Sequence, residues 1–144
     1  MTPLGIINYP VGNCNWEVRG DLELIYASEE VQEQCAGLKL AKKLFGGDAQ
    51  TARKLLSRIN ALEQAETLKD IVIQPQFHFH NLRNKKGKDL EDFFAIDIKS
   101  RANPWRLILR PLDEDKEPFE PCKIDEIVST VEIVEIMEVS KHYE

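Results

Sequence analysis

The first half of the chain carries helical patterns of apolar residues after one short strand-like run. Residues 22–27 (LELIYA) are apolar and include Tyr and Ile, which predicts a first strand. Ser28 followed by two glutamates predicts a helix start, because a hydroxyl caps free N–H groups and acids favour the positive end of the helix dipole. We expect this helix to end at about Ala36, before Gly37.

Two further helices are expected before Pro75. The apolar residues of the first recur at helical spacing up to the glycine pair at 46–47, which predicts its end. They are Leu38, Ala41, Leu44 and Phe45. Asp48 then predicts the cap of a longer helix with one apolar stripe facing the core. The stripe consists of Ala52, Leu55, Leu56, Ile59 and Leu62. A short turn is expected at 67–71.

The second half has the pattern of strands. Three short runs rich in aromatic and β-branched residues, separated by turn-like segments, lie at 77–82, 93–98 and 105–110. An acidic, proline-containing loop follows. The last run, 128–140, has glutamates at every third position, which fits neither a regular strand nor a helix, and its Val and Ile content predicts a strand with a bulge. Helices followed by strands predict an α+β fold, with N-terminal helices packed on a C-terminal antiparallel sheet.

Composition is that of one soluble globular domain. The chain has 144 residues, 42% hydrophobic and 31% charged. Residues 1–20 show no periodicity and are interpreted as an irregular extension of a domain spanning 21–144. No apolar run reaches the length of a membrane span, and no basic segment precedes an apolar one at the N-terminus, so we expect no membrane association and a cytoplasmic location. The three cysteines, Cys14, Cys35 and Cys122, are expected to be free thiols.

Charge is distributed unevenly. The net charge is −6, yet residues 37–60 hold six bases and one acid, and residues 83–110 hold eight bases and four acids. Residues 112–138 hold ten acids and two bases. Each charged segment is interpreted either as a solvated face or, for the basic ones, as a place where an anion docks.

Sequence motifs exclude several kinds of chemistry. The chain has no GxSxG, no phosphate-binding glycine loop and no HExxH. His78 and His80 are expected on one face of a strand, but without a nearby carboxylate or cysteine they do not predict a metal site, and no cofactor is expected. The remaining cationic, His and Tyr side chains suit cleavage of an RNA phosphodiester, which needs a base, an acid and cations. These candidates are His80, Arg83, Lys85, Lys86, Arg106, His142 and Tyr143.

Three segments carry a resemblance to a known family. Residues 80–87 are similar to the family segment H-x-L-K-G-x-(R/K)-x-G, residues 105–109 to its aromatic-Arg-Leu strand, and residues 140–143 to its terminal His-bearing strand. In this order, over residues 22–144, the chain resembles the RelE/ParE toxin superfamily, most closely its HigB-type killer proteins. The resemblance implies a RelE-like fold and a ribosome-dependent mRNA endonuclease that works by metal-free transesterification. It also implies an antitoxin partner that blocks the active site.

The resemblance also implies roles for residues. His80 would lie at the scissile phosphate as acid, base or positioner, Arg106 would stabilise the transition state, and His142 with Tyr143 would be the C-terminal acid or base. The RNA-binding residues would be Arg83, Lys85, Lys86 and Arg110. Arg83 stands where the family has Lys, which suits phosphate binding better than proton transfer. Trp105 is interpreted as a packing residue or, alternatively, as a platform for base stacking.

Two departures from the family keep other functions open. Asp97 stands where many active toxins carry an arginine, and a carboxylate there would repel the phosphate. It is otherwise interpreted as an exposed strand residue, paired with Lys99 or Arg106. The net charge of −6 would also weaken binding to RNA. The alternatives are a non-catalytic protein-binding module of the same fold and a ParE-like toxin that acts on a protein target. The sequence predicts no oligomeric state.

Overall fold

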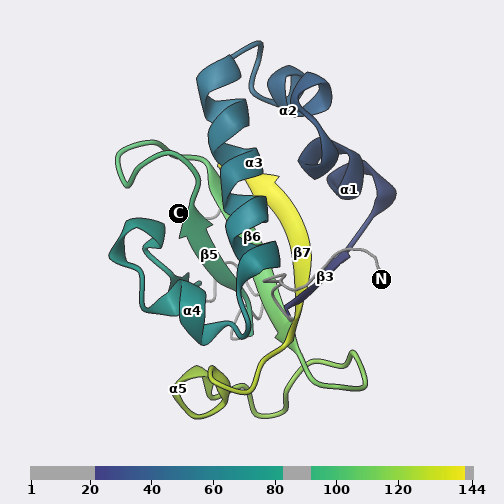
Figure 1. The fold of residues 1–144 in the computed structure, drawn as a ribbon, viewed down its shortest axis with the longest axis vertical. Coiled ribbons are helices and arrows are strands. Elements are labelled where there is room, and N and C mark those ends of the chain that lie inside the picture. The colour runs from purple at the N-terminus through teal and green to yellow at the C-terminus, as the bar shows by residue number, and fades with distance from the viewer. Residues whose placement is uncertain (1–21, 83–91, 142–144) are drawn as a thin grey trace, which may run out of the picture.

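The computed structural model describes residues 22–82 and 92–141 and shows an α+β fold (Figure 1). Its helices are α1 (Glu29–Ala36), α2 (Leu38–Leu44), α3 (Ala49–Gln64), α4 (Lys69–Val72), α5 (Ile124–Ile127) and the 3-10 helix η1 (Pro75–Phe77). Its strands are β3 (Glu23–Tyr26), β4 (His80–Asn81), β5 (Phe94–Asp97), β6 (Arg106–Leu112) and β7 (Ile133–Ser140). The extension predicted at 1–20 lies outside the described residues.

Local side-chain chemistry sets the ends of the helices, as the sequence predicts. The Ser28 side chain accepts a hydrogen bond from the Val31 N–H at the start of α1. Asp48 accepts hydrogen bonds from two backbone N–H groups at the start of α3 and from the Thr51 hydroxyl. These hydrogen bonds hold the pKa of Asp48 below its ordinary value, and the bond from the Thr51 hydroxyl has the largest effect. The chain turns between α2 and α3 through Gly46 and Gly47, both at positive φ, a conformation that glycine adopts without strain.

The five strands form one mixed sheet in the order β3-β7-β6-β5-β4. The pairs β4–β5, β5–β6 and β6–β7 are antiparallel, but β3 pairs with β7 in parallel. The expectation of an antiparallel sheet is therefore wrong at this edge. A parallel neighbour needs a long crossover connection, and the helices between the first strand and the last supply one. The apolar run at 22–27 carries no information about direction.

The predicted bulge lies in β7. Glu138 pairs with Ile108, while the next residue of β6, Leu109, pairs with Ile136, so Met137 is the extra residue. This explains the spacing of the glutamates. Glu135 pairs with Arg110 and Glu138 with Ile108, and these two β6 residues lie on one face of the strand. The bulge thus brings two glutamates three positions apart onto the same face of the sheet.

The main core lies between α3 and one face of the sheet (Figure 1). Leu55, Ile59 and Leu62 of α3 are buried against the alternate strand residues Ile96, Leu107, Leu109, Val134 and Ile136. Leu56, which the sequence places in the stripe, is only half-buried at its edge. On the other face of the sheet, Leu82, Ala95 and Ile108 form a second, smaller buried cluster. The sheet therefore has buried residues on both of its faces.

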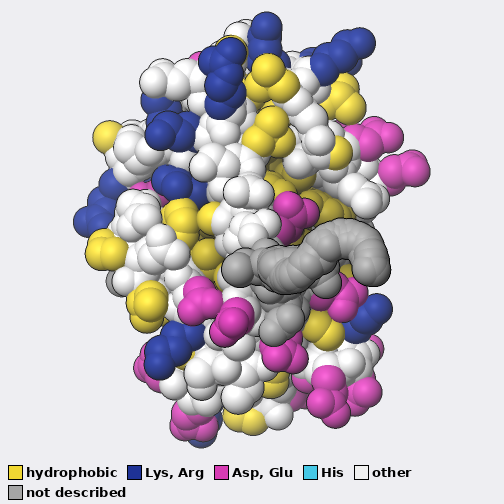
Figure 2. All heavy atoms as spheres, in the orientation of Figure 1, with side chains coloured by type: hydrophobic (Ala, Val, Ile, Leu, Met, Phe, Trp, Pro, Cys, Tyr) yellow, Lys and Arg dark blue, Asp and Glu magenta, His cyan; other side chains and the backbone are white. Residues whose placement is uncertain are grey.

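Charge separates along the long axis of the molecule (Figure 2). Lysine and arginine side chains gather at the upper end, where α2 and the start of α3 lie. The exposed bases there are Lys39, Lys42, Lys43, Arg53 and Lys54. Exposed acids of the 112–126 region lie toward the other end: Glu114, Asp115, Glu117, Glu120, Asp125 and Glu126. The longest helix in the described part of the chain, α3, has 16 residues, and none there combines the length and apolar character of a membrane span.

Candidate functional site

The structure describes three of the eight site residues that the sequence predicts: His80, Arg106 and Arg110. The other five lie outside the described residues: Arg83, Lys85, Lys86, His142 and Tyr143. The three described residues come from β4 and β6 and lie on the sheet face opposite α3, since their strand positions alternate with the core residues. Two of them belong to one polar network and the third does not.

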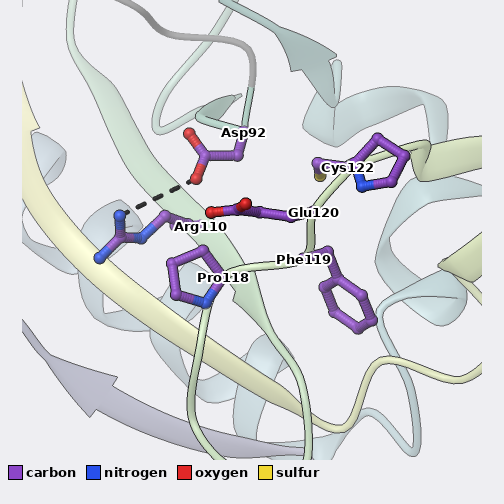
Figure 3. Close-up of a pocket in the computed structure, with 7 residues that line it drawn as sticks. Asp92, Arg110, Pro118, Phe119, Glu120 and Cys122 are labelled. Carbon is purple, nitrogen blue, oxygen red and sulfur yellow. Dashed lines mark ion pairs between the residues drawn. The ribbon is translucent and has the colours of Figure 1, made fainter.

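Arg110 lies outside that network and is surrounded by acids. Its guanidinium lies 2.7 Å from Glu135 Oε1 and 3.8 Å from Asp92 Oδ2, and it covers the Phe93 ring at 5.4 Å. It lines a cavity of about 710 Å³ whose other walls include Phe119, and Figure 3 shows the Asp92–Arg110 pair among the lining residues. The positive charge of Arg110 is thus balanced within the chain. RNA binding by Arg110 stays a prediction, and these contacts disfavour it.

The same cavity contains a free thiol. Cys122 lines the cavity, and Cys35 is a second free thiol, buried in the main core. Burial raises the pKa of Cys35 to about 12, and burial also raises the pKa of Cys122. The prediction of free thiols is confirmed for these two residues, whereas Cys14 lies outside the described residues.

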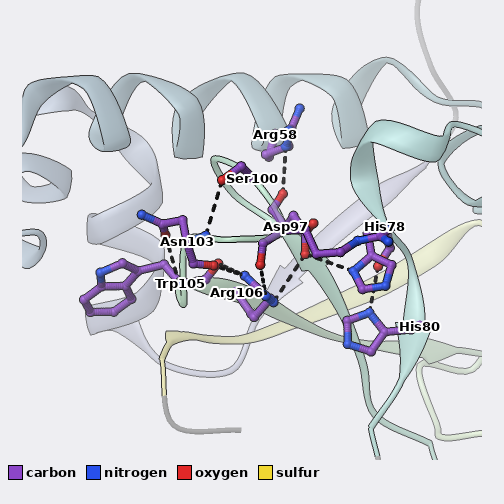
Figure 4. A network of polar contacts seen from close by, with 9 residues as sticks. Arg58, His78, His80, Asp97, Ser100, Asn103, Trp105 and Arg106 are labelled. Carbon is purple, nitrogen blue, oxygen red and sulfur yellow. Dashed lines mark hydrogen bonds and ion pairs between the residues drawn. The ribbon is translucent and has the colours of Figure 1, made fainter. Parts of the chain in front are cut away.

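Asp97 and Arg106 form the centre of the polar network (Figure 4). They face each other in register across β5 and β6, with Nε of Arg106 3.3 Å from Oδ1 of Asp97. Asp97 is 2% exposed and Arg106 7%. The interpretation of Asp97 as an exposed residue is therefore wrong, and its predicted pairing with Arg106 is confirmed. Alternation places Asp97 on the second face of the sheet, and that face is covered, which the pattern alone does not reveal.

Arg106 also holds the loop that leads into its own strand. Its Nη1 donates to the backbone carbonyls of Asn103 and Trp105, and its Nη2 donates to the carbonyl of Arg101 at 3.1 Å. A guanidinium with this many partners in its own chain is fixed in orientation. The predicted role in transition-state stabilisation stays untested, and these contacts favour a positioning role for Arg106.

His78 joins the network through the other side of Asp97. Its Nδ1 lies 3.3 Å from Asp97 Oδ1, the same oxygen that Arg106 contacts. His78 is not part of a strand, because it follows η1 with φ 48° and ψ 50°, in the left-handed region. Histidine is one of the few residues enriched there. The expectation that His78 and His80 lie on one face of a strand is therefore wrong, as is the expectation that no carboxylate lies nearby.

His80 stacks on His78. The two ring centroids are 4.4 Å apart with an interplanar angle of 30°, and Nδ1 of His80 lies 2.7 Å from the backbone carbonyl of His78. A carbonyl oxygen only accepts, so this Nδ1 carries a proton and donates it. In the neutral ring the lone pair is then on Nε2, the atom that can accept a proton from a substrate.

Trp105 lies on the α2 side of the site. Its ring packs edge-on against Phe45, with centroids 4.9 Å apart, and the Lys141 ammonium lies 5.5 Å above it. Its backbone N–H donates to the Asn103 side chain. The interpretation of Trp105 as a packing residue is confirmed, and base stacking stays a prediction.

Two site residues are absent from the set that the sequence predicts: His78, discussed there as a possible metal ligand, and Asp97, interpreted as a departure from the family or as an exposed strand residue. The signal for both is weak. A His-x-His pair enters one strand and an acid ends the next, but their contact depends on the register of β4 with β5 and on η1. In residues 22–82 and 92–141, no group of three or more His, Cys, Asp or Glu side chains is placed to hold a metal ion.

Comparison of the chain with protein-family models, curated proteins and solved structures finds no match. The function is therefore inferred from the polar network itself. It places two imidazoles, a buried carboxylate and a buried guanidinium together at one end of the sheet. Such a set can accept a proton, donate one and hold both rings in fixed orientations.

Proposed function

We propose that this chain is a toxin of a type II toxin–antitoxin pair, with a RelE-like fold, that cleaves mRNA on the ribosome. The observation that carries the proposal is the His80–His78–Asp97–Arg106 network, which lies at one end of the sheet. The order of the helices and the central β5–β6–β7 antiparallel strands support it, as does the family resemblance of the three segments. The sheet differs from the expected one only in its parallel β3 edge.

The chemistry proposed is transesterification without a metal. A base removes the proton of a 2′-hydroxyl, the 2′-oxygen bonds to phosphorus, and the bond from phosphorus to the 5′-oxygen breaks. The leaving oxygen takes up a proton, and the product carries a 2′,3′-cyclic phosphate. Nε2 of His80 is the proposed base, because the Nδ1 proton of this ring is held by the His78 carbonyl. Imidazole suits this role at neutral pH.

Phosphate binding falls to residues outside the network. Arg106 and Arg110 are both paired with carboxylates, so we assign the contact with the phosphate to Arg83, Lys85 and Lys86, as the resemblance implies. His142 and Tyr143 remain candidates for proton transfer on the same grounds. The exposed bases of α2 and α3 would add long-range attraction for the RNA backbone despite the net charge of −6.

One observation favours a second candidate function. Each of the two arginines that the structure describes in the predicted site is neutralised by an acid of the same chain. A site whose cations are already paired is suited to a non-catalytic member of the fold that binds a partner protein. A ParE-like action on a protein target depends on the resemblance alone. The nuclease is the better-supported function because histidines with defined tautomers serve proton transfer and are not needed for protein binding.

Induction of the chain in a bacterial host separates the two functions. We expect growth arrest and new mRNA 5′ ends inside translated codons, both abolished by His80→Gln. The matched control is Lys116→Gln, an exposed lysine of the acidic loop after β6, which should arrest growth like the wild type. Normal growth from a well-expressed wild-type chain, with no new 5′ ends, would overturn the nuclease and favour the binding module.

A further inference from the structure

We propose that His78 is the general acid of this site, that it protonates the 5′-oxygen leaving group, and that Asp97 is its positioning residue. The proposal rests on the proposed function. It assigns a catalytic role to a residue that the family segments do not include, since the matching segment begins at His80. Four features of the described residues support this role: the buried carboxylate, the tautomer it selects, the exposure of His78 and the stack with His80.

The carboxylate determines which nitrogen of His78 faces the substrate. Asp97 is almost fully buried, and an ionised carboxylate only accepts hydrogen bonds, so Nδ1 of His78 is the donor of this contact. The second nitrogen, Nε2, is then directed away from Asp97. Arg106 contacts the same carboxylate oxygen and keeps Asp97 from turning (Figure 4). The contact at Nδ1 thus fixes the orientation of the ring while Nε2 stays directed away from Asp97, as a general acid requires.

His78 is accessible where Asp97 is not. Its side chain is 32% exposed, whereas that of Asp97 is 3% exposed. The left-handed backbone after η1 places the ring between the buried carboxylate and the surface. A non-glycine residue keeps this strained conformation only where its surroundings compensate for the cost. Here the contact with Asp97 holds it, and such strained residues concentrate at functional sites.

The stacked pair of histidines assigns one of the two proton transfers to each ring. Positive charges on two rings whose centroids lie 4.4 Å apart would repel each other, so one positive charge on the pair is favoured over two. Asp97 lies against His78 and attracts that charge, whereas the His80 Nδ1 donates to a neutral carbonyl. These contacts assign proton donation to His78 and proton acceptance to His80. Other charged groups at His78 are Arg106, paired with Asp97, and Arg58, whose Nε donates to the Asp97 carbonyl at 2.8 Å.

The proton balance of the reaction follows from this arrangement. His80 Nε2 takes the 2′-hydroxyl proton as the 2′-oxygen bonds to phosphorus. The bond between phosphorus and the 5′-oxygen breaks, and His78 Nε2 gives its proton to that oxygen. The pair starts and ends with the same number of protons, because His80 gains the one from the 2′-hydroxyl and His78 loses the one that is then on the 5′-oxygen. No oxidant, metal or further reactant takes part.

The test uses an mRNA whose 5′-oxygen at the cleavage position is replaced by sulfur. A thiolate leaves without protonation, so loss of the general acid no longer slows the reaction. The variant is His78→Asn, because asparagine adopts the left-handed conformation with little strain. We expect it to cut ordinary mRNA on the ribosome about 100-fold more slowly than the wild type. On the sulfur-containing mRNA it should cut as fast as the wild type. His80→Gln, which removes the base, should stay slow on both.

The pH dependence tests the role of Asp97. The wild-type rate should rise as His80 loses its proton and fall as His78 loses its proton. In Asp97→Asn the falling limb should move to lower pH, because an amide stabilises the imidazolium less than a carboxylate does. A purely structural role would lower the rate without moving that limb.

The outcomes distinguish this proposal from the function on which it depends. A wild-type chain that cuts neither mRNA overturns the proposed function, and the role of His78 with it. A wild-type chain that cuts, together with a His78→Asn variant that is equally fast on ordinary mRNA or equally slow on both substrates, overturns the role of His78 alone. Rescue by sulfur in His78→Asn but not in His80→Gln establishes the general acid.

Discussion

Arg106 and Asp97 form an ion pair, 3.3 Å long, between the first residue of β6 and the last residue of β5, and both residues are almost fully excluded from solvent. The pair has two consequences. It neutralises a carboxylate that would otherwise be costly to bury, and it fixes the oxygen that His78 contacts. Asp97 departs from the arginine of the family, which would weaken phosphate binding. In this structure the same residue orients His78.

Removal of one member of this pair should destabilise the fold. Arg106→Met leaves Asp97 as a buried charge without its cation and also removes the hydrogen bonds to the 101–105 loop. We expect the free energy of unfolding to fall by about 3–5 kcal/mol. Urea denaturation followed by circular dichroism measures it. Arg53→Met, an exposed arginine of α3, is the matched control and should change stability by no more than about 0.5 kcal/mol. Equal effects from the two substitutions would contradict the buried pair.

Two neighbouring leucines of α3 should respond differently to truncation. Leu55 is fully buried in the main core, whereas Leu56 is half-buried at its edge. Leu55→Ala should lower the free energy of unfolding by about 2–5 kcal/mol, and Leu56→Ala by clearly less. The difference tests the rotation of α3 against the sheet, since both changes remove the same atoms. A larger effect at Leu56 would mean that α3 presents another face to the sheet.

The two described thiols should react slowly in the native protein. Burial raises the pKa of Cys35 to about 12, so almost none of it is thiolate at pH 8. Cys122 is half-buried and its pKa is also raised, chiefly by burial. Iodoacetamide labelling with peptide mass spectrometry should show Cys122 reacting more slowly than free cysteine, and Cys35 not reacting until the chain unfolds. Rapid labelling of native Cys35 would contradict its place in the core.

Stability should decline at high pH. The pKa of Tyr26 rises from 10.0 to about 12, mainly through burial, and that of Cys35 rises from 9.0 to about 12. Between about pH 9 and 12 the folded chain therefore binds more protons than the unfolded chain, and the free energy of unfolding falls as pH rises. Tyr26→Phe should make this fall shallower above pH 10. Denaturation at a series of pH values measures how the free energy of unfolding changes. A free energy of unfolding that rises with pH over this range would contradict the prediction.

Sequence reasoning gave those elements whose causes are local. Ser28 and Asp48 cap helices through side-chain bonds to N–H groups within three residues, so the cap is visible in the sequence itself. The bulge in β7 was visible because it alters the spacing of Glu135 and Glu138 along one strand. In each case the residues that determine the structure are neighbours in the chain.

What the sequence could not give depends on contacts between distant segments. The parallel pairing of β3 with β7 joins residues more than one hundred positions apart. The burial of Asp97 requires that the second face of the sheet be covered, and alternation along β5 does not say which faces are covered. The contact of His78 with Asp97 needs both the register of β4 and the left-handed turn after η1.

The most direct test of the central claim is the chemistry of the RNA ends. The purified chain is mixed with ribosomes translating a defined mRNA, and the new 3′ ends are analysed for a 2′,3′-cyclic phosphate. The account predicts cyclic phosphate ends from the wild-type chain and none from His80→Gln. Intact mRNA, or cleavage that leaves a free 3′-hydroxyl, would contradict transesterification by this pair of histidines.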